Sequence, residues 1–266
     1  MLRNLQIEWM KIRHYRMFQV FSILYMLGII LIIYIFYRIY MSVLAEIQNA
    51  LTNGQSREAG DVFSFFTATN IWKTVMFSTS FLLYLPGMVI INLFINEVNF
   101  KTHRQNIIDG WKRETFIYTK IGLIVAMSLV ITFMNLVATI IMCQVTNVDF
   151  SFAGAYHLIY CFIQSFVYLM FALLLATVFR KSGVAIIVFF SYGLILEWLL
   201  LWGLMKIDPS IAFYLPLQAA DSLIMLPNMN KLMSSLPGIQ YLLIATLIYS
   251  TLYMWLTVRK YKYDDL

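Results

Sequence analysis

The sequence predicts an all-α integral membrane protein, with residues 1–266 forming a single polytopic membrane domain. Of its 266 residues, 61% are hydrophobic and only 12% are charged, whereas a soluble domain carries about 25% charged residues. So few charges cannot cover a globule with polar surface, which makes a bilayer the natural surroundings of this chain. The second observation is that six separate segments reach the about 20 apolar residues needed to cross a membrane.

The six predicted transmembrane helices are separated by shorter, more polar segments. They cover residues 18–37, 74–95, 116–143, 154–179, 184–205 and 239–258. Orientation follows from Lys and Arg, which accumulate in cytoplasmic loops. Of the 19 Lys and Arg residues, those on the minority side are Arg38, Arg57, Lys73, Lys206 and Lys231. The majority side holds both termini and the segment between the second and third spans, so we expect these to be cytoplasmic.

The residues before the first span have the pattern of an interfacial amphipathic helix. Apolar side chains recur there at helical spacing at Leu2, Leu5, Trp9 and Ile12, a pattern typical of helices that lie along a membrane surface. An ordinary basic flank is the alternative. The start of the chain lacks the short apolar core and the following cleavage site of a signal peptide, so we do not expect it to be one. After the first span, residues 42–70 include the polar run TNGQSREAGD and are expected to form a solvated loop.

Residues 206–238, before the last span, combine prolines with apolar residues. Four of the five prolines lie here: Pro209, Pro216, Pro227 and Pro237. Proline suits short, interrupted helices, and irregular backbone at membrane depth persists only when protein or a cavity surrounds it. We therefore expect a broken re-entrant helical hairpin that dips into the outer leaflet. The alternative is a loop lying on the membrane surface.

A polar segment at residues 97–114 separates the second and third spans. Thr102 and Gln105 have the spacing of a capping box, and Gly110 suits the left-handed position that ends a helix. The short helix between them carries an apolar patch formed by Ile107, Ile108 and Trp111. Because an isolated helix of two turns is unstable in water, a partner or the membrane surface is expected to hold it at the cytoplasmic face.

This segment, NEVNFKTHRQNIIDGWKRETFIYTK, resembles the cytoplasmic loop of the ABC-2 type exporter permeases, the transmembrane subunits of bacterial ATP-binding-cassette transporters. That family has a glutamate, then a Gly-Thr pair, a Ser-Arg pair and a lysine that opens the third span. The residues that match in order and spacing are Glu97, Thr102, Arg113 and Lys120. Lys101 replaces the family glycine and Lys112 replaces the serine. The overall layout of spans, interfacial helix and broken hairpin is also similar.

The resemblance implies a coupling helix that docks into a separate ATPase subunit. The coupling residues would be Glu97, Thr102, Arg104, Gln105, Ile107, Ile108, Trp111, Arg113 and Lys120. It also implies a bacterial cytoplasmic membrane protein that works with a second permease chain, in a homodimer or a related heterodimer. The substrate would be amphipathic or lipid-like, a peptide or a drug, and would leave the cytoplasm or inner leaflet by alternating access.

The chain itself carries no motif for ATP chemistry. It lacks G-x-x-x-x-G-K-[ST], the loop that cradles nucleotide phosphates, so ATP and Mg²⁺ would bind to the partner subunit and this chain would need no cofactor. No pattern indicates a catalytic site, a metal site or nucleic-acid binding. The alternative function is a membrane scaffold or assembly subunit that uses a partner ATPase for mechanical work without transporting a solute.

Two further features are candidates for a role in transport. Pro86 and Gly87, in YLPGM, form a hinge candidate in the second span, with a static kink as the alternative. Glu197 is the one acidic residue well inside a predicted span, where a charge is costly and is expected to face the bundle. It either lines the substrate path or pairs structurally with Arg38 or Tyr34.

Overall fold

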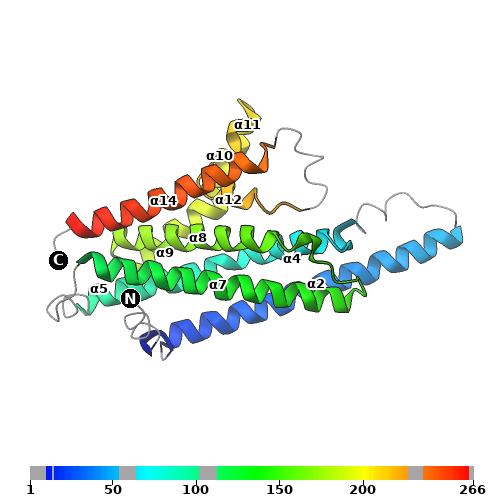
Figure 1. Ribbon diagram of the computed structural model, residues 1–266, viewed down its shortest axis with the longest axis horizontal. Helices are drawn as coiled ribbons and strands as arrows, with labels where there is room; N and C mark the ends of the chain where they lie inside the picture. Colours follow the sequence, from blue (N-terminus) through cyan, green and yellow to red (C-terminus); the bar gives the residue numbers. More distant parts are fainter. Residues whose placement is uncertain (1–9, 14, 54–63, 102–112, 227–235, 264–266) are drawn as a thin grey trace.

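The computed structural model describes residues 10–13, 15–53, 64–101, 113–226 and 236–263. Within these residues the regular structure is helical, and six helices are long and apolar enough to cross a membrane. Each of the six expected segments lies inside one of them. The helices run side by side along the length of an elongated bundle, while α10 and α11 rise away from its axis (Figure 1).

Three of the six spans are interrupted by other helical types. The first, third and sixth spans are the continuous helices α2 (Arg16–Asn53), α7 (Arg113–Val145) and α14 (Ile239–Tyr263). The second span joins α4 (Asn70–Ser80), the 3-10 turn η2 (Phe81–Leu83) and α5 (Tyr84–Asn99). The fourth joins the 3-10 turn η3 (Phe152–Gly154) to α8 (His157–Phe179). The fifth joins α9 (Ser182–Ser191), the π-helical turn η4 (Tyr192–Leu196) and α10 (Glu197–Met205).

Helix α8 forms the centre of the bundle. It packs against α5, α7, α9 and α14, and its side chains at Val167, Leu169 and Leu173 are fully buried. Ala172 and Ala176 are also fully buried, as expected where small residues let neighbouring helices approach closely. By contrast, few side chains of the first span are buried, so α2 lies at the periphery of the chain.

Helix α2 is much longer than the expected span of 18–37. Its 38 residues correspond to about 57 Å at 1.5 Å per residue, well beyond the about 30 Å of a hydrocarbon core. The expectation of a loop from residue 42 onward is therefore wrong for residues 42–53. The sequence there, SVLAEIQNALTN, contains neither Gly nor Pro, and its Ala, Leu, Glu and Gln residues favour continued helix.

The second span is irregular one turn before Pro86. The 3-10 turn η2 ends at Leu83, and Pro86 is the third residue of α5. Proline has no N–H to donate to the carbonyl four residues earlier, which belongs to Leu82. The tighter 3-10 turn occurs where this α-helical hydrogen bond is unavailable. The missing N–H of Pro86 therefore gives a physical reason for the irregularity at this position.

The described part of the segment before the last span, residues 206–226, contains two very short helices. These are α11 (Pro209–Ala212) and α12 (Gln218–Asp221). Asp208 caps α11 by accepting hydrogen bonds from the Ser210 N–H at 2.9 Å and hydroxyl at 2.7 Å, and these bonds hold the pKa of the Asp208 carboxyl below its usual range. Residues 212, 213, 217, 219 and 220 are fully buried, whereas Ile207 and Ile211 are exposed, so the later part of this segment is packed within the protein.

Candidate functional site

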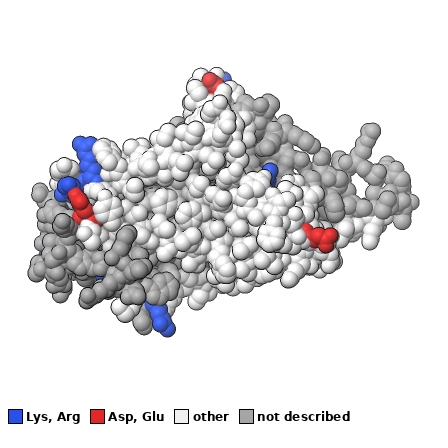
Figure 2. Space-filling model, viewed as in Figure 1, with Lys and Arg blue, Asp and Glu red and all other residues white. Residues whose placement is uncertain are grey.

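One end of the bundle collects the first and last described residues and most of the described basic side chains. In Figure 1 the start of α2 and the end of α14 lie at the left, as do the end of α5, the start of α7 and the turn between α8 and α9. The described cations on these segments are Lys11, Arg13, Arg16, Lys101, Lys120, Arg180, Lys181, Arg259, Lys260 and Lys262. Blue atoms gather mainly at this end of the visible face (Figure 2). We call it the basic end.

A buried ion pair joins α5 to α7 at the basic end. The Lys120 Nζ lies 2.6 Å from the Glu97 Oε1, and the two side chains are 4% and 13% exposed. The ammonium group also lies 5.1 Å from the centre of the Phe116 ring. Sequence analysis placed Glu97 and Lys120 in the coupling set without foreseeing that they touch, and the structure brings them together from the two helices that flank residues 100–112.

Aromatic contacts tie the last helix to this ion pair. The rings of Phe116 and Tyr261 stack at 5.3 Å, and Phe94 lies 6.2 Å from Phe116 and 6.1 Å from Tyr261. Next to them, at the surface, Lys262 and Glu114 form an exposed ion pair at 2.7 Å. The ends of α5, α7 and α14 are therefore held together by both packing and charge.

The N-terminal segment is attached at the same end. The Asn96 amide donates a hydrogen bond to the Tyr15 hydroxyl at 2.6 Å, and Ile12 is buried. Leu2, Leu5 and Trp9, on which the expectation of an interfacial helix also depends, lie outside the described residues.

Most of the expected coupling helix falls outside the part of the chain that the structure describes. This applies to Thr102, Arg104, Gln105, Ile107, Ile108, Gly110 and Trp111. Arg113 begins α7. Just before the segment, Lys101 has a φ of 57°, the left-handed conformation that glycine adopts most readily after a helix.

A second group of polar side chains lies inside the bundle, around Glu197. This residue follows the π-helical turn η4 directly and is buried. Its Oε1 accepts hydrogen bonds from the backbone N–H groups of Leu217 at 2.6 Å and Gln218 at 2.9 Å. The expected pairing with Arg38 or Tyr34 is wrong, because both are exposed on α2. The carboxylate instead holds the start of α12.

Asp221, at the end of α12, is a second interior carboxylate that sequence analysis missed. It accepts hydrogen bonds from the Gln164 amide at 2.8 Å and from the Tyr168 hydroxyl at 2.9 Å. Both donors belong to α8, so the carboxylate anchors α12 to the centre of the bundle. The signal that was available is an acidic residue in the otherwise apolar run IAFYLPLQAADSLIMLP.

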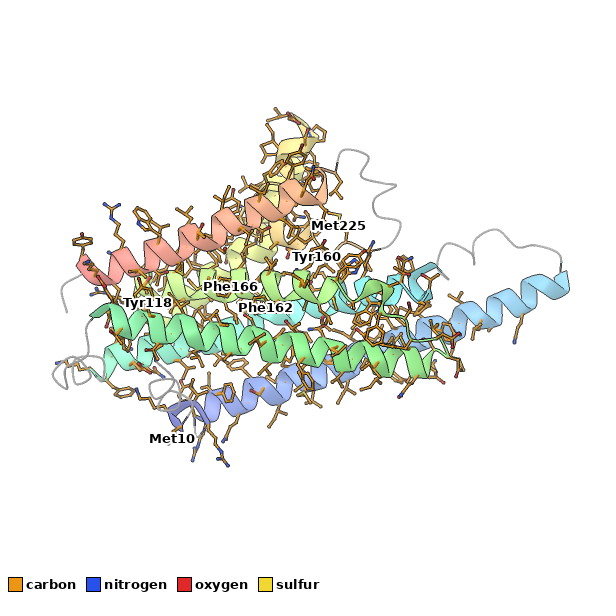
Figure 3. All side chains as sticks on the ribbon, in the orientation of Figure 1. Met10, Tyr118, Tyr160, Phe162, Phe166 and Met225 are labelled. Atoms are coloured by element: carbon orange, nitrogen blue, oxygen red, sulfur yellow. The ribbon has the colours of Figure 1, made fainter. Side chains whose placement is uncertain are left out.

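A cavity of about 100 Å³ separates α12 from the second and fifth spans. Its polar lining includes Asp221, Gln218, Tyr84, Tyr168 and Ser80. The remaining lining residues are Phe77, Phe81, Gly193, Leu194, Trp198, Leu201 and Met225, the last labelled in Figure 3. We call this space the Asp221 cavity.

Gly193, in the π-helical turn, lets the second span approach the Asp221 cavity. A Cβ at this position would lie 2.2 Å from the Tyr84 hydroxyl oxygen, a distance that non-bonded atoms do not tolerate. Tyr84 in turn packs against Tyr168, Phe189 and Phe190, with ring centres 5.7, 5.2 and 5.0 Å away. Bare backbone at Gly193 is thus needed for the tyrosine to lie at the cavity wall.

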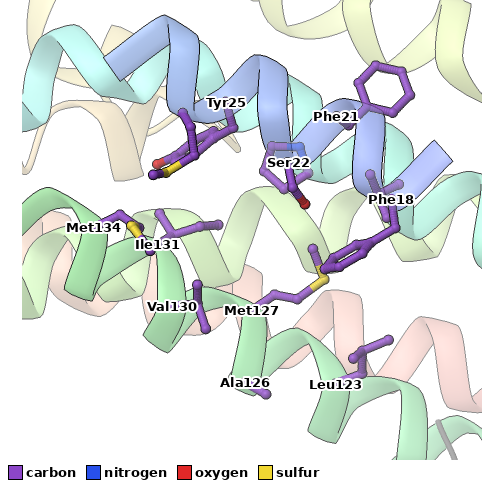
Figure 4. A pocket seen from close by; sticks show the side chains of 13 residues that line it. Phe18, Phe21, Ser22, Tyr25, Leu123, Ala126, Met127, Val130, Ile131 and Met134 are labelled. Carbon is purple, nitrogen blue, oxygen red and sulfur yellow. The ribbon is translucent and has the colours of Figure 1, made fainter. Parts of the chain in front are cut away.

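The hinge candidates Pro86 and Gly87 face different neighbours. Pro86 lines an apolar groove of about 180 Å³ between α2, α5 and α7, where Phe18 and Tyr25 of α2 face Met127 and Met134 of α7 (Figure 4). Gly87 packs against α9, since a Cβ there would lie 2.5 Å from the Phe189 ring. Close helix packing is therefore one reason for the glycine.

The described residues contain no cluster of three or more His, Cys, Asp or Glu side chains that could hold a metal ion. Cys143 and Cys161 are buried free thiols.

Comparison with protein-family models and with curated proteins finds no match for this chain.

Proposed function

We propose that this chain is the permease subunit of an ATP-driven exporter of the ABC-2 type. The observation that carries the proposal is the buried Glu97–Lys120 ion pair. These two residues are the first and last of the four that match the family pattern, and they link the two helices on either side of the proposed coupling segment. Such a link makes the ends of α5 and α7 move as one unit.

The ion pair suits a lever that transmits force from a cytoplasmic ATPase. A partner that pushes on residues 102–112 would push on both flanking helices, because Glu97 and Lys120 are nearly excluded from solvent and are bonded at 2.6 Å. The force would pass along α5 toward the irregular turn before Pro86 and along α7 through the full bundle. Packing of Phe116 on Tyr261 would extend it to α14.

The backbone at Lys101 adds support for the family. The ABC-2 pattern has glycine at this position, and here the residue adopts a φ of 57°. Its N–H bonds to the Val98 carbonyl at 3.2 Å, while the Phe100 N–H bonds to the Asn96 carbonyl at 2.9 Å. This is the geometry in which a left-handed residue ends a helix, so a glycine in the family pattern has a conformational reason.

In the proposed arrangement the basic end faces the bacterial cytoplasm, following the rule that positive charge stays inside. Both termini and residues 97–114 would lie there, and the segment 206–238 would enter the outer leaflet as a broken hairpin. A separate ATPase subunit would bind ATP and Mg²⁺, and a second permease chain would complete the path. Apolar side chains exposed on α2, α10 and α14 are suited to contact lipid or that second chain.

Cysteine cross-linking tests the proposal. With Cys143 and Cys161 replaced by Ala, a single cysteine at position 106 should cross-link to a co-expressed ATP-binding-cassette subunit encoded beside this gene. A cysteine at position 147, in the turn after α7 at the other end of the bundle, is the matched control and should not. In intact cells an impermeant thiol reagent should label position 147 and leave position 106 unlabelled.

Two results would contradict the proposal. Labelling of position 106 in intact cells would put the segment on the wrong side of the membrane for an ATPase. Cross-linking that is equal at positions 106 and 147 would show that the contact is not specific. If the complex forms, reconstitution in vesicles with an amphipathic cargo separates a transporter from a scaffold, because only a transporter moves the cargo with ATP.

A further inference from the structure

The Asp221 cavity combines a carboxylate with aromatic walls. Asp221 lines it from α12, and rings from three spans surround it: Phe77, Phe81 and Tyr84 from the second, Tyr168 from the fourth and Trp198 from the fifth. Phe81 and Trp198 are 54% and 60% exposed, so the rim of the cavity reaches the outside of the chain. A molecule dissolved in the membrane would meet these two rings first.

The acidic side chains in this region have no cationic partner among the described residues. Asp221 is bonded to neutral donors, Gln164 and Tyr168. Glu197 is bonded to two backbone N–H groups, and one of them belongs to Gln218, which also lines the cavity. Each carboxylate oxygen can accept more than one hydrogen bond, so Asp221 retains capacity for a donor from a ligand.

The two interior carboxylates belong to one unit of structure. The Glu197 side chain, from α10, accepts a hydrogen bond from Gln218, the first residue of α12, and Asp221 is the last residue of the same helix. One acidic group therefore lies at each end of α12. When these groups are ionised, their negative potential excludes anions and favours a cation. Aromatic faces add attraction for a cation, and they favour organic ammonium groups over strongly hydrated metal ions.

We propose that the Asp221 cavity binds the ammonium group of a cationic amphiphile. The ammonium group donates a hydrogen bond to Asp221 and lies against the ring of Trp198, while the apolar part of the ligand extends past Phe81 into the membrane. That this ligand is the cargo of the exporter rests on the proposed function. Binding to the chain itself requires no ATPase.

Calorimetric titration of the full chain in phosphatidylcholine nanodiscs tests this proposal. Octylammonium is the probe, octanol is its neutral counterpart, and empty nanodiscs provide the baseline for partition into lipid. We expect saturable binding of octylammonium above that baseline and none of octanol. Asp221→Asn keeps the shape of the side chain and removes its charge, and it should weaken binding about tenfold or more, as expected for a charged hydrogen bond.

Two further variants keep the test decisive if Asp221→Asn is poorly folded. Trp198→Leu changes an exposed side chain and should weaken binding about two- to fivefold through loss of the cation–π contact. Asp208→Asn removes the same charge from the exposed cap of α11, away from the cavity lining, and should leave binding unchanged. Equal binding of octylammonium and octanol, or affinity unaffected by both Asp221→Asn and Trp198→Leu, would overturn the proposal.

The outcome is independent of the cross-linking result. Binding that depends on Asp221 without cross-linking at position 106 would support the cavity and contradict the exporter. Specific cross-linking at position 106 without such binding would support the exporter and contradict the cavity.

Discussion

The basic end and the Asp221 region both bury charge in an apolar chain, yet they compensate it in opposite ways. At the basic end Glu97 meets a cation, Lys120, at 2.6 Å. Around the Asp221 cavity two carboxylates meet only neutral donors: backbone N–H groups for Glu197, and an amide and a hydroxyl for Asp221. The first region places a cation directly against its carboxylate, whereas the acidic groups of the second region have only neutral donors around them.

The difference suggests what each region is suited to do. An opposite-charge pair costs much to break, because either partner alone is left buried and uncompensated, so it suits a rigid joint between helices. A carboxyl group held by neutral donors is positioned without a permanently bound cation, so it suits reversible binding of a cationic ligand. Five predictions test the two regions, from the largest expected effect to the smallest.

The largest effect is expected for Lys120→Met, which removes the ammonium group that lies 2.6 Å from the nearly buried Glu97 carboxylate. The free energy of unfolding should fall by about 3–5 kcal/mol, as measured by denaturant unfolding in detergent. The double variant Glu97→Gln with Lys120→Met should recover much of the loss. Lys262→Met breaks the exposed pair with Glu114 and should have little effect, because solvent already screens it. A similar loss in both single variants would remove the distinction between a buried joint and a surface contact.

Glu197→Ala should have the next largest effect. It removes the acceptor for two backbone N–H groups, and each unsatisfied buried donor costs about 1–3 kcal/mol. Glu197→Gln keeps an acceptor oxygen and should cost clearly less. Chemical unfolding of both variants measures the difference.

The same series separates two possible partners of Glu197. The structure predicts that Glu197→Gln and Arg38→Gln act additively, since distant side chains with no shared partner do not couple. Marked non-additivity would restore the pairing of Glu197 with Arg38 that sequence analysis suggested.

Gly193→Ala should destabilise the chain by about 1–3 kcal/mol, the usual cost of overpacking a core. The added Cβ would lie 2.2 Å from the Tyr84 hydroxyl oxygen. Gly203→Ala is the matched control in the same span, because nothing lies within 4 Å of its added Cβ. Thermal unfolding of the two variants compares them directly. Tyr84→Phe should rescue Gly193→Ala in part, and equal effects at positions 193 and 203 would argue against the close contact.

The smallest predicted effect is a gain. Lys101→Gly should raise the free energy of unfolding by up to about 1 kcal/mol, because glycine adopts the left-handed conformation without the strain of a Cβ. Lys101→Ala keeps the Cβ and should give no gain. A gain with alanine as well would attribute the effect to the lost charge instead of the backbone.

Sequence patterns predicted the features that depend on residues close together in the chain. Span positions follow from the summed transfer of consecutive apolar side chains, so the six expected segments each fall inside a helix of the structure. The irregular turn before Pro86 follows from one missing N–H. Span ends are harder to predict: α2 continues to Asn53, because helix propensity carries it past the point where hydropathy falls.

The partners of the interior charges were decided by the tertiary structure. Glu197 was recognised as costly from the sequence alone, but its partners are backbone N–H groups 20 and 21 residues away. Every residue except proline has such a group, so no residue type signals it. Asp221 was missed because its position in a Pro-rich segment hides how deeply α12 packs against α8.

The sequence by itself determined that this chain is helical, that it has six segments suited to a membrane, and that positive charge favours one set of loops. These properties depend on residue type and spacing along the chain. Only the tertiary structure decided that Glu97 touches Lys120, that Glu197 caps α12 and that Asp221 lines a cavity walled by aromatic rings. The hydrogen bonds from Lys120 to Glu97, from Leu217 to Glu197 and from Gln164 to Asp221 join residues 23, 20 and 57 positions apart. Their geometry depends on how whole helices pack.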